Sequence, residues 1–444
     1  MRSYLILGMC LLFLVQYFVG NQWLQYVVVL FALLAFIGSA AKADRLPRII
    51  GIMMMTVGFV IELSKGTGVD GISNGIFMIL PLLCLITLAP LLSVPLRLGG
   101  YFESVSHLLR NLLHQPKKLY AGITGTLFVL SPILNLGSVR IINDFLEELK
   151  LPSAMSAKSY VVGFSTAMLW SPYFASVTLI LHYQNVPYSE FFFYGISLSI
   201  LSLVVGNLLF AFWEKRNPMS IEGAGQFVPF GKDHRSNILK LILFVILLII
   251  SCLLIEGFTH WSMVVIVCLL SVIVPFLFGL VSRSWKKLLP HLSDYRDRTV
   301  PMLNNEIMLF MSAGLLAYAL KGTSIMNGVS YVLTLLANQS FILFAIAIIL
   351  IVFCITYMGI HQIAAVGVLA MQLDPNELGI SSLALALTLL LTWATTTALS
   401  PFSGLNLMVS KFAHLSGNQV GLRINGLHLI TIVFLGIALI SFVK

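Results

Sequence analysis

The chain has 444 residues, of which 59% are hydrophobic and only 10% are charged, and its mean hydropathy is +0.98. This composition excludes an ordinary soluble globular protein and predicts an all-α polytopic membrane protein. The formal net charge of +9 predicts no nucleic-acid partner, because the Lys and Arg residues lie between apolar runs, where they orient helices in the bilayer.

Eleven apolar runs are long enough to cross a bilayer as helices, and two further stretches are interrupted near their centres by turn-forming residues. We predict that these two stretches, 119–139 and 340–372, are re-entrant hairpins with tips near Asn135 and His361. The eleven predicted spans are residues 4–19, 23–41, 48–63, 71–94, 158–183, 188–213, 236–256, 261–281, 302–320, 379–410 and 422–443.

The basic residues predict the orientation, because cytoplasmic loops carry an excess of Lys and Arg. With the N-terminus inside and the C-terminus outside, 23 of the 26 Lys and Arg residues fall on the cytoplasmic side. A full crossing at either hairpin would move every later loop to the other side and weaken this asymmetry. The first hairpin is therefore predicted to enter from the cytoplasm and the second from outside.

A repeated pattern links the two halves of the chain. Ser171 and Ser400, each followed by proline, interrupt two apolar runs and are 229 positions apart. Amphipathic segments at 104–115 and 328–339 precede the two hairpins and are predicted to lie along the membrane surface. Because the hairpins enter from opposite sides, the halves are inverted repeats. Inverted repeats with broken helices are typical of secondary transporters whose site lies near the bilayer midplane.

The two Ser-Pro interruptions have the chemistry of an ion site. Proline removes a backbone donor and frees a carbonyl, which a membrane helix tolerates only where protein, water or a ligand satisfies it. The freed carbonyls and the neighbouring hydroxyl and amide oxygens suit a dehydrated sodium ion, and the half-helix after each proline directs its positive end toward an anion. The structural alternative is a proline kink in which Ser and Thr side chains satisfy the backbone.

Titratable side chains are scarce around the predicted site. His361 either binds an anion, relays a proton, or is a tip histidine satisfied by backbone, and Arg140 either neutralises the substrate or orients the hairpin. Glu62, Glu306 and His428 lie near span ends, where we expect them to be interfacial. Sodium is favoured over proton coupling because no Asp, Glu, Lys or Arg occurs in 119–139, 159–181, 340–373 or 378–410.

These features together resemble the ion transporter superfamily, in particular the divalent anion:sodium symporters. The resemblance covers nearly the whole chain as architecture, but in sequence it is confined to the Ser-Pro turns, and the hairpin tips lack the family's Ser-Asn-Thr motif. It implies a homodimer in which a transport domain moves against a scaffold like an elevator. The implied divisions are scaffold at 1–95 and 236–323, transport parts with an interfacial helix at 96–213 and 324–444, and a cytoplasmic linker at 214–235.

The resemblance also implies two sodium sites, each between a hairpin tip and a helix break, with the substrate between the tips. The candidate cation ligands are Ser131, Asn135, Ser165, Thr166, Ser171, Gly359, Thr395, Thr396, Ser400 and Asn406. The candidate substrate-binding residues are Asn135, Gly137, Ser138, Ser171, Pro172, His361, Gln362, Ser400 and Pro401.

The sequence therefore predicts a secondary transporter of a small organic or inorganic anion, in the cell membrane of a bacterium, with sodium as the coupling ion and no other cofactor. Two alternatives remain open, a carrier of a lipid-linked or polyprenyl substrate and a membrane glycan polymerase or ligase. An enzyme is disfavoured, because the sequence has no Walker-type loop, no cluster of metal ligands and no nucleophile with a base at a suitable spacing.

Overall fold

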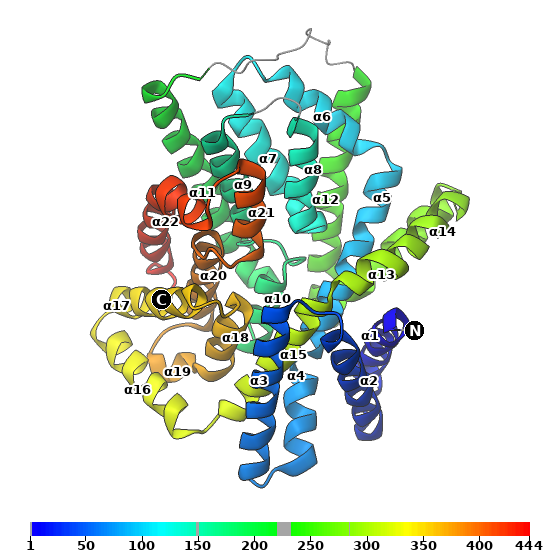
Figure 1. Ribbon diagram of the computed structural model, residues 1–444, viewed down its shortest axis with the longest axis vertical. Coiled ribbons are helices and arrows are strands. Elements are labelled where there is room, and N and C mark those ends of the chain that lie inside the picture. Colours follow the sequence, from blue (N-terminus) through cyan, green and yellow to red (C-terminus); the bar gives the residue numbers. More distant parts are fainter. Residues whose placement is uncertain (1, 148–150, 220–231, 284) are drawn as a thin grey trace.

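The computed structural model describes residues 2–147, 151–219, 232–283 and 285–444, and all its regular elements in this part are helices (Figure 1). Nine helices of the described part are long and apolar enough to cross a membrane, or up to ten if a bent pair is one span. The prediction of an all-helical, multi-pass membrane protein is confirmed. The middle of the predicted linker, 220–231, lies outside the described residues.

Nine of the eleven predicted spans coincide with these long helices. Short helices η1 (Ala89–Leu92) and α5 (Ser93–Leu98) continue α4, and π-helix η5 (Gln419–Ile424) leads into α22. The principal elements are α1 (Arg2–Val19), α2 (Gln22–Ala40), α3 (Arg45–Ser64), α4 (Gly68–Leu88), α11 (Tyr188–Arg216), α12 (Lys232–Thr259), α13 (Met263–Val281), α20 (Ser382–Leu399), α21 (Gly404–Ala413) and α22 (Asn425–Ile440).

The count of eleven was wrong at two places. The run 158–183 is divided between α9 (Ser153–Ala167) and α10 (Ala175–Gln184), because the segment around Pro172 leaves the helical path and neither piece reaches 18 residues. The run 302–320 is α15 (Asn304–Leu320), which is bent by 56° from the segment before it. That segment consists of α14 (Trp285–Asp294), η3 (Tyr295–Thr299) and η4 (Val300–Met302).

Both predicted hairpins are pairs of helices that pack against each other. Helices α7 (Pro116–Leu134) and α8 (Leu136–Leu146) meet at Asn135, whose φ is 50°. Helices α17 (Phe341–Tyr357) and α18 (Gln362–Gln372) are joined through Gly359, whose φ of 93° is one that glycine adopts without strain. Whether each pair re-enters the membrane stays a prediction. Helices α6 (Tyr101–Asn111) and α16 (Ser324–Gln339) precede them, and α19 (Pro375–Leu378) follows the second.

The 229-residue repeat extends to the boundaries of the helices. Helices α10 and α21 are both 10 residues long and begin at Ala175 and Gly404, which are 229 positions apart, as are the first residues of α9 and α20. Left-handed residues, Asn185 and His414, cap α10 and α21 at equivalent positions. The two halves of the chain therefore fold the broken helix in the same way.

The two broken helices run antiparallel, as an inverted arrangement requires. The first half of each, α9 or α20, packs against the second half of the other, α21 or α10 (Figure 1). The hairpins interleave with them: α7 packs on α9 and α8 on α21, whereas α17 and α18 pack on α20 and α18 also packs on α10. A Cβ on Gly163 would lie 2.7 Å from Leu127 Cβ, so α7 and α9 are in close contact there.

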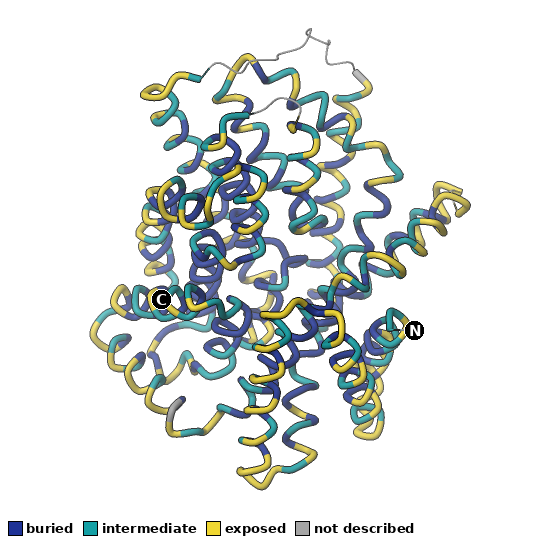
Figure 2. Tube along the Cα trace, viewed as in Figure 1, coloured by how far each residue is buried: buried dark blue, intermediate teal, exposed yellow. Residues whose placement is uncertain are grey.

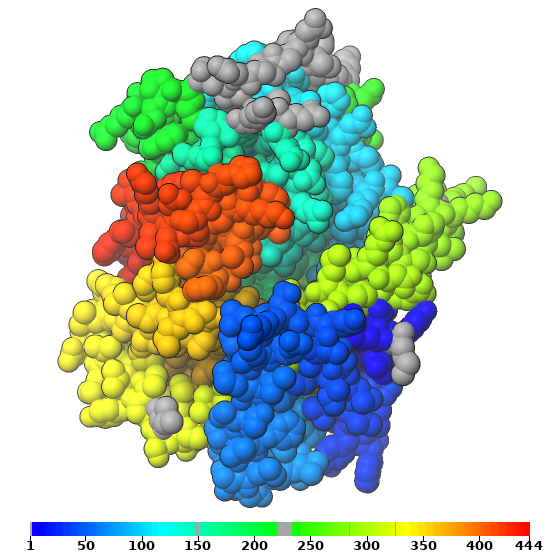
Figure 3. Space-filling model, in the orientation of Figure 1, coloured from blue at the N-terminus to red at the C-terminus, as the bar shows by residue number. Residues whose placement is uncertain are grey.

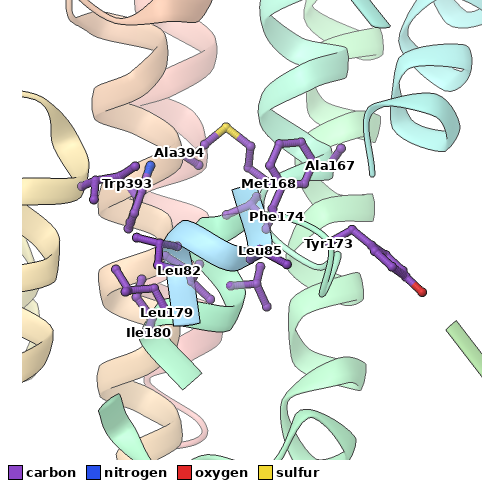
Figure 4. Close-up of a cluster of buried hydrophobic side chains, with 14 of the residues drawn as sticks. Leu82, Leu85, Ala167, Met168, Tyr173, Phe174, Leu179, Ile180, Trp393 and Ala394 are labelled. Carbon is purple, nitrogen blue, oxygen red and sulfur yellow. The ribbon is translucent and has the colours of Figure 1, made fainter. Parts of the chain in front are cut away.

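Burial is greatest where these helices cross (Figure 2), and within the segment Ser382–Ala413 the most apolar stretch of 18 residues is 89% buried. In the space-filling view, the surface of α21 and α22 adjoins that of the first repeat (Figure 3). Met168, Phe174 and Trp393 belong to the buried apolar cluster at the first break (Figure 4). Every fourth residue of α20 from Thr388 to Thr396 is a threonine that donates to the carbonyl one turn earlier, which satisfies these hydroxyls inside the protein.

Candidate functional site

One cavity of about 510 Å³ lies where the hairpins and the broken helices meet. The first residues of four half-helices line it: Leu136 of α8, Ala175 of α10, Gln362 of α18 and Gly404 of α21. Each helix N-terminus carries a partial positive charge and backbone amides without a partner in the helix. The cavity therefore concentrates positive electrostatic potential between the two repeats.

Backbone amides at two of these N-termini are free to bind a ligand. Among the described residues, the amides of Ala175 and Ser176 in α10 donate to no protein acceptor, and neither do those of Gly404 and Leu405 in α21. All four residues line the cavity. A pair of free amides at a helix N-terminus is an established arrangement for binding phosphate, sulfate or carboxylate.

The first break is held by local hydrogen bonds. Ser171 is fully buried, and its Oγ accepts a hydrogen bond of 3.2 Å from the amide of Tyr173. Ser176 Oγ donates to the carbonyl of Met168 at 3.3 Å, which satisfies one of the acceptors freed at the end of α9. The residue that precedes α10 is Phe174, which has no side-chain acceptor for the helix.

The second break is more extensively bonded and is tied to the second hairpin. Ser400 Oγ donates to the carbonyl of Thr356 in α17 at 3.0 Å and accepts from the amide of Phe402 at 3.3 Å. Asn406 is fully buried, and its Nδ2 donates to three carbonyls, of which Ala398 at 3.2 Å and Gly417 at 3.0 Å are the shorter contacts. Asn406 therefore satisfies the backbone freed by the break.

The tip of the first hairpin is closed by a serine pair. Ser131 Oγ and Ser138 Oγ are 2.8 Å apart, and Ser138 Oγ donates to the carbonyl of Asn135 at 2.7 Å. Both serines are fully buried, whereas Asn135 is exposed and lines the cavity. Asn135 Oδ1 accepts from the amide of Leu136 and so caps α8, which leaves its side-chain NH₂ as a donor for a ligand.

The tip of the second hairpin presents a histidine. His361 Nδ1 accepts a hydrogen bond of 3.2 Å from the amide of Ile363 and caps α18. Nδ1 is thus unprotonated, so the neutral ring carries its proton on Nε2 and offers one N–H donor. The ring makes an edge contact with Phe310 of α15, with centroids 5.7 Å apart, and both residues line the cavity.

Four acidic or basic side chains also line the cavity. Arg97 and Arg140 are exposed, and neither is paired with a carboxylate among the described residues. Asp294 forms a 2.9 Å ion pair with Arg298. Glu306, in the first turn of α15, also lines the cavity.

The predicted substrate residues fall into two groups. Those that line the cavity are Asn135, Gly137, His361 and Gln362, whereas Ser138, Ser171, Pro172, Ser400 and Pro401 are absent from its wall. Of the predicted cation ligands, only Asn135 lines the cavity; Ser131, Ser165, Thr166, Ser171, Gly359, Thr395, Thr396, Ser400 and Asn406 do not. The hydroxyl groups of several predicted cation ligands donate to backbone carbonyls, as expected if Ser and Thr only satisfy the backbone at a proline kink. A hydroxyl oxygen that donates in this way still keeps a lone pair that can bind a cation.

Among the cavity residues that sequence reasoning missed are Glu306 and Thr397. Glu306 was expected at the interface, but the bend before α15 brings its first turn into the cavity wall. Thr397 is 7% exposed, and its Oγ1 has no hydrogen-bond partner among the described residues. The position of Thr397 beside the second break was the one sequence signal that could have marked it as a cavity residue. Nothing in the sequence favoured it over the two threonines that precede it.

No family model matches the sequence, and no curated protein matches it. Among solved structures, the chain is similar to the YdaH transporter of Alcanivorax borkumensis, with a TM-score of 0.61 and 14% sequence identity. The match covers 89% of this chain and 98% of that one. Because the identity is so low, this likeness shows the fold alone: the chain has the fold of a membrane transporter.

Proposed function

We propose that the protein is a secondary active transporter of an organic anion. The observation that carries this proposal is the convergence of four half-helix N-termini on one cavity, with two pairs of free amides among them. A cavity of about 510 Å³ has the size of sites for drug-sized molecules. Much of its wall is apolar, including Phe164, Phe174 and Trp393, so an organic anion fits it better than an inorganic one.

The proposed coupling ion is sodium. The second break supports it best, because Ser400 joins the end of α17 to the break and gathers hydroxyl and carbonyl oxygens at one buried place. Oxygen ligands of this kind suit a hard cation such as sodium. The sequence equivalent in the first repeat is Ser171, and it is the proposed second site.

Movement by an elevator mechanism follows from the predicted division into scaffold and transport parts. The cavity lies between them, since α8, α10, α18 and α21 belong to the transport parts and Glu306 and Phe310 to the scaffold. Hydrogen bonds cross from one to the other at several places. Among them are Tyr183 Oη to the carbonyl of Met78 at 3.0 Å and Gln372 Nε2 to the carbonyl of Ala317 at 2.9 Å. A homodimer held by the scaffold is part of this proposal.

The test starts from purified full-length protein. Thermal stability is measured against a panel of aliphatic and aromatic carboxylates, sulfonates and phosphate esters, each with sodium and with potassium. We expect organic anions to raise the melting temperature more in sodium than in potassium, because the anion and the sodium ion are both proposed to bind at the helix breaks. Radiolabelled uptake of the best anion into proteoliposomes should then require an inward sodium gradient.

Two results would count against the proposal in different ways. Stabilisation by cations or neutral solutes but by no organic anion would contradict the assignment of substrate. Uptake of an anion that follows a proton gradient and ignores sodium would leave the transporter but remove the coupling ion.

A further inference from the structure

Glu306 is an acidic side chain in a cavity where four helix N-termini attract anions. It lies in the first turn of α15, one helical turn before Phe310, which contacts His361 at the tip of the second hairpin. Glu306 and Phe310 both line the cavity. The carboxyl group therefore faces the same space as the four helix N-termini but from the scaffold side.

One oxygen of this carboxyl group lacks a partner within the described part of the chain. Its Oε2 is buried and accepts no hydrogen bond, and no described Lys, Arg or His forms an ion pair with it. The nearby acidic residue Asp44 is by contrast satisfied, because its Oδ2 accepts from Asn305 Nδ2 at 2.7 Å. A buried carboxylate oxygen without a partner is costly, so its presence at a cavity indicates a ligand group that satisfies it.

We infer that the transported anion also carries an ammonium or other hydrogen-bond-donating cationic group, which Glu306 accepts. The substrate is then amphoteric, with its anionic group at the helix N-termini of the transport part and its cationic group at the scaffold. This inference rests on the proposed function. A purely anionic substrate would meet repulsion from Glu306, whereas a charged hydrogen bond there favours the amphoteric molecule over its deaminated analogue.

The competing role for such a carboxyl group is to bind a proton and to couple its movement to transport. Substrate recognition and proton coupling can be told apart by replacing the glutamate with glutamine, which has nearly the same shape but no charge. Removing a recognition group changes the preference among ligands, whereas removing a proton site changes the pH dependence of transport and leaves the ligand preference intact.

The experiment compares matched ligands on E306Q, with D44N as the control for loss of a neighbouring acidic charge outside the cavity. The probes are phenylalanine against 3-phenylpropanoate and 6-aminohexanoate against hexanoate, and dissociation constants are measured by titration of the melting temperature. In the wild type and D44N we expect the amino-bearing member of at least one pair to bind about tenfold more tightly. In E306Q that ratio should fall to about one.

Three outcomes would overturn the inference. These are equal or tighter binding of the deaminated acids by the wild type, an unchanged ratio in E306Q, and loss of pH-dependent uptake in E306Q with its ligand preference intact. If E306Q does not fold, E306D serves instead, because its shorter carboxylate should reduce the ratio without abolishing it, and an unchanged ratio there contradicts the inference. Failure of every organic acid to bind the wild type would instead contradict the proposed function.

Discussion

Replacing Ser400 with Ala should loosen the second hairpin from the second helix break. Ser400 Oγ donates to the carbonyl of Thr356, at the end of α17, and accepts from the amide of Phe402. The matched control is Ser171→Ala at the equivalent position of the first repeat. Ser171 Oγ only accepts from the amide of Tyr173 and makes no hydrogen bond to a hairpin among the described residues.

The difference between the two variants can be estimated from these bonds. A hydrogen bond contributes about 0.5–1.5 kcal/mol net, and side-chain bonds in membrane proteins average about 0.6 kcal/mol. Ser400→Ala removes two hydrogen bonds, one of them buried, and Ser171→Ala removes one, so the former should cost about 1 kcal/mol more. Because the extra bond joins the hairpin to the break, that energy should appear as easier local opening of the hairpin tip.

Hydrogen exchange measured by mass spectrometry reads this opening directly. A cost of about 1 kcal/mol should speed exchange of the tip, residues 357–363, about fivefold in Ser400→Ala, because about 1.4 kcal/mol corresponds to tenfold. Ser171→Ala should leave these residues unchanged. Equal acceleration in both variants, or none in either, would show that the Ser400 bond does not hold the hairpin to the break.

Three further substitutions, one of them with a matched control, test other contacts. Asn406→Leu should lower the melting temperature through a cost of about 3 kcal/mol, because three carbonyls, buried or partly buried, lose their donor. The control, Val177→Ala at the equivalent position, should cost about 1 kcal/mol. Gly163→Val should destabilise the protein in the same assay by about 1–3 kcal/mol, since its side chain would clash with Leu127, and unchanged stability would contradict the close contact of α7 and α9. Ala175→Asp should weaken binding of the transported anion by at least about tenfold in a thermal titration, because its carboxylate would occupy the α10 N-terminus, and unchanged affinity would remove that terminus from the site.

Much of the repeated architecture could be predicted from sequence because it depends on local chemistry. Proline cannot donate a backbone hydrogen bond, so the two Ser-Pro turns marked both helix breaks. Their spacing of 229 residues also predicts that α21 begins at Gly404, given that α10 begins at Ala175. The hairpin tips were visible for a related reason, because Asn135 and Gly359 adopt positive φ values, which most other residues avoid.

What the sequence could not predict are features set by packing between distant segments. The bend of 56° before α15 decides that Glu306 lines the cavity, and no residue in that segment signals its direction. Similarly, Ser171 and Ser400 lie at the same helix breaks as residues that line the cavity, but both serines are deeply buried and do not line it. The sequence alone cannot show this, because it depends on the antiparallel packing of the two broken helices. Which side of a helix faces a ligand depends on its neighbours and not on its own residues.

The interleaving of the two repeats has a consequence for transport. Since each hairpin packs on helices from both halves of the chain, the four N-termini at the cavity belong to one packed body and would move together. In the proposed division Glu306 belongs to the scaffold, so its contact with a bound molecule would break when the transport part moves. A ligand shifts a conformational equilibrium only through interactions that differ between the states, and Glu306 supplies such a difference. The helix N-termini would then bind the substrate throughout transport, whereas Glu306 would select among substrates only when the cavity is open on the side where they enter.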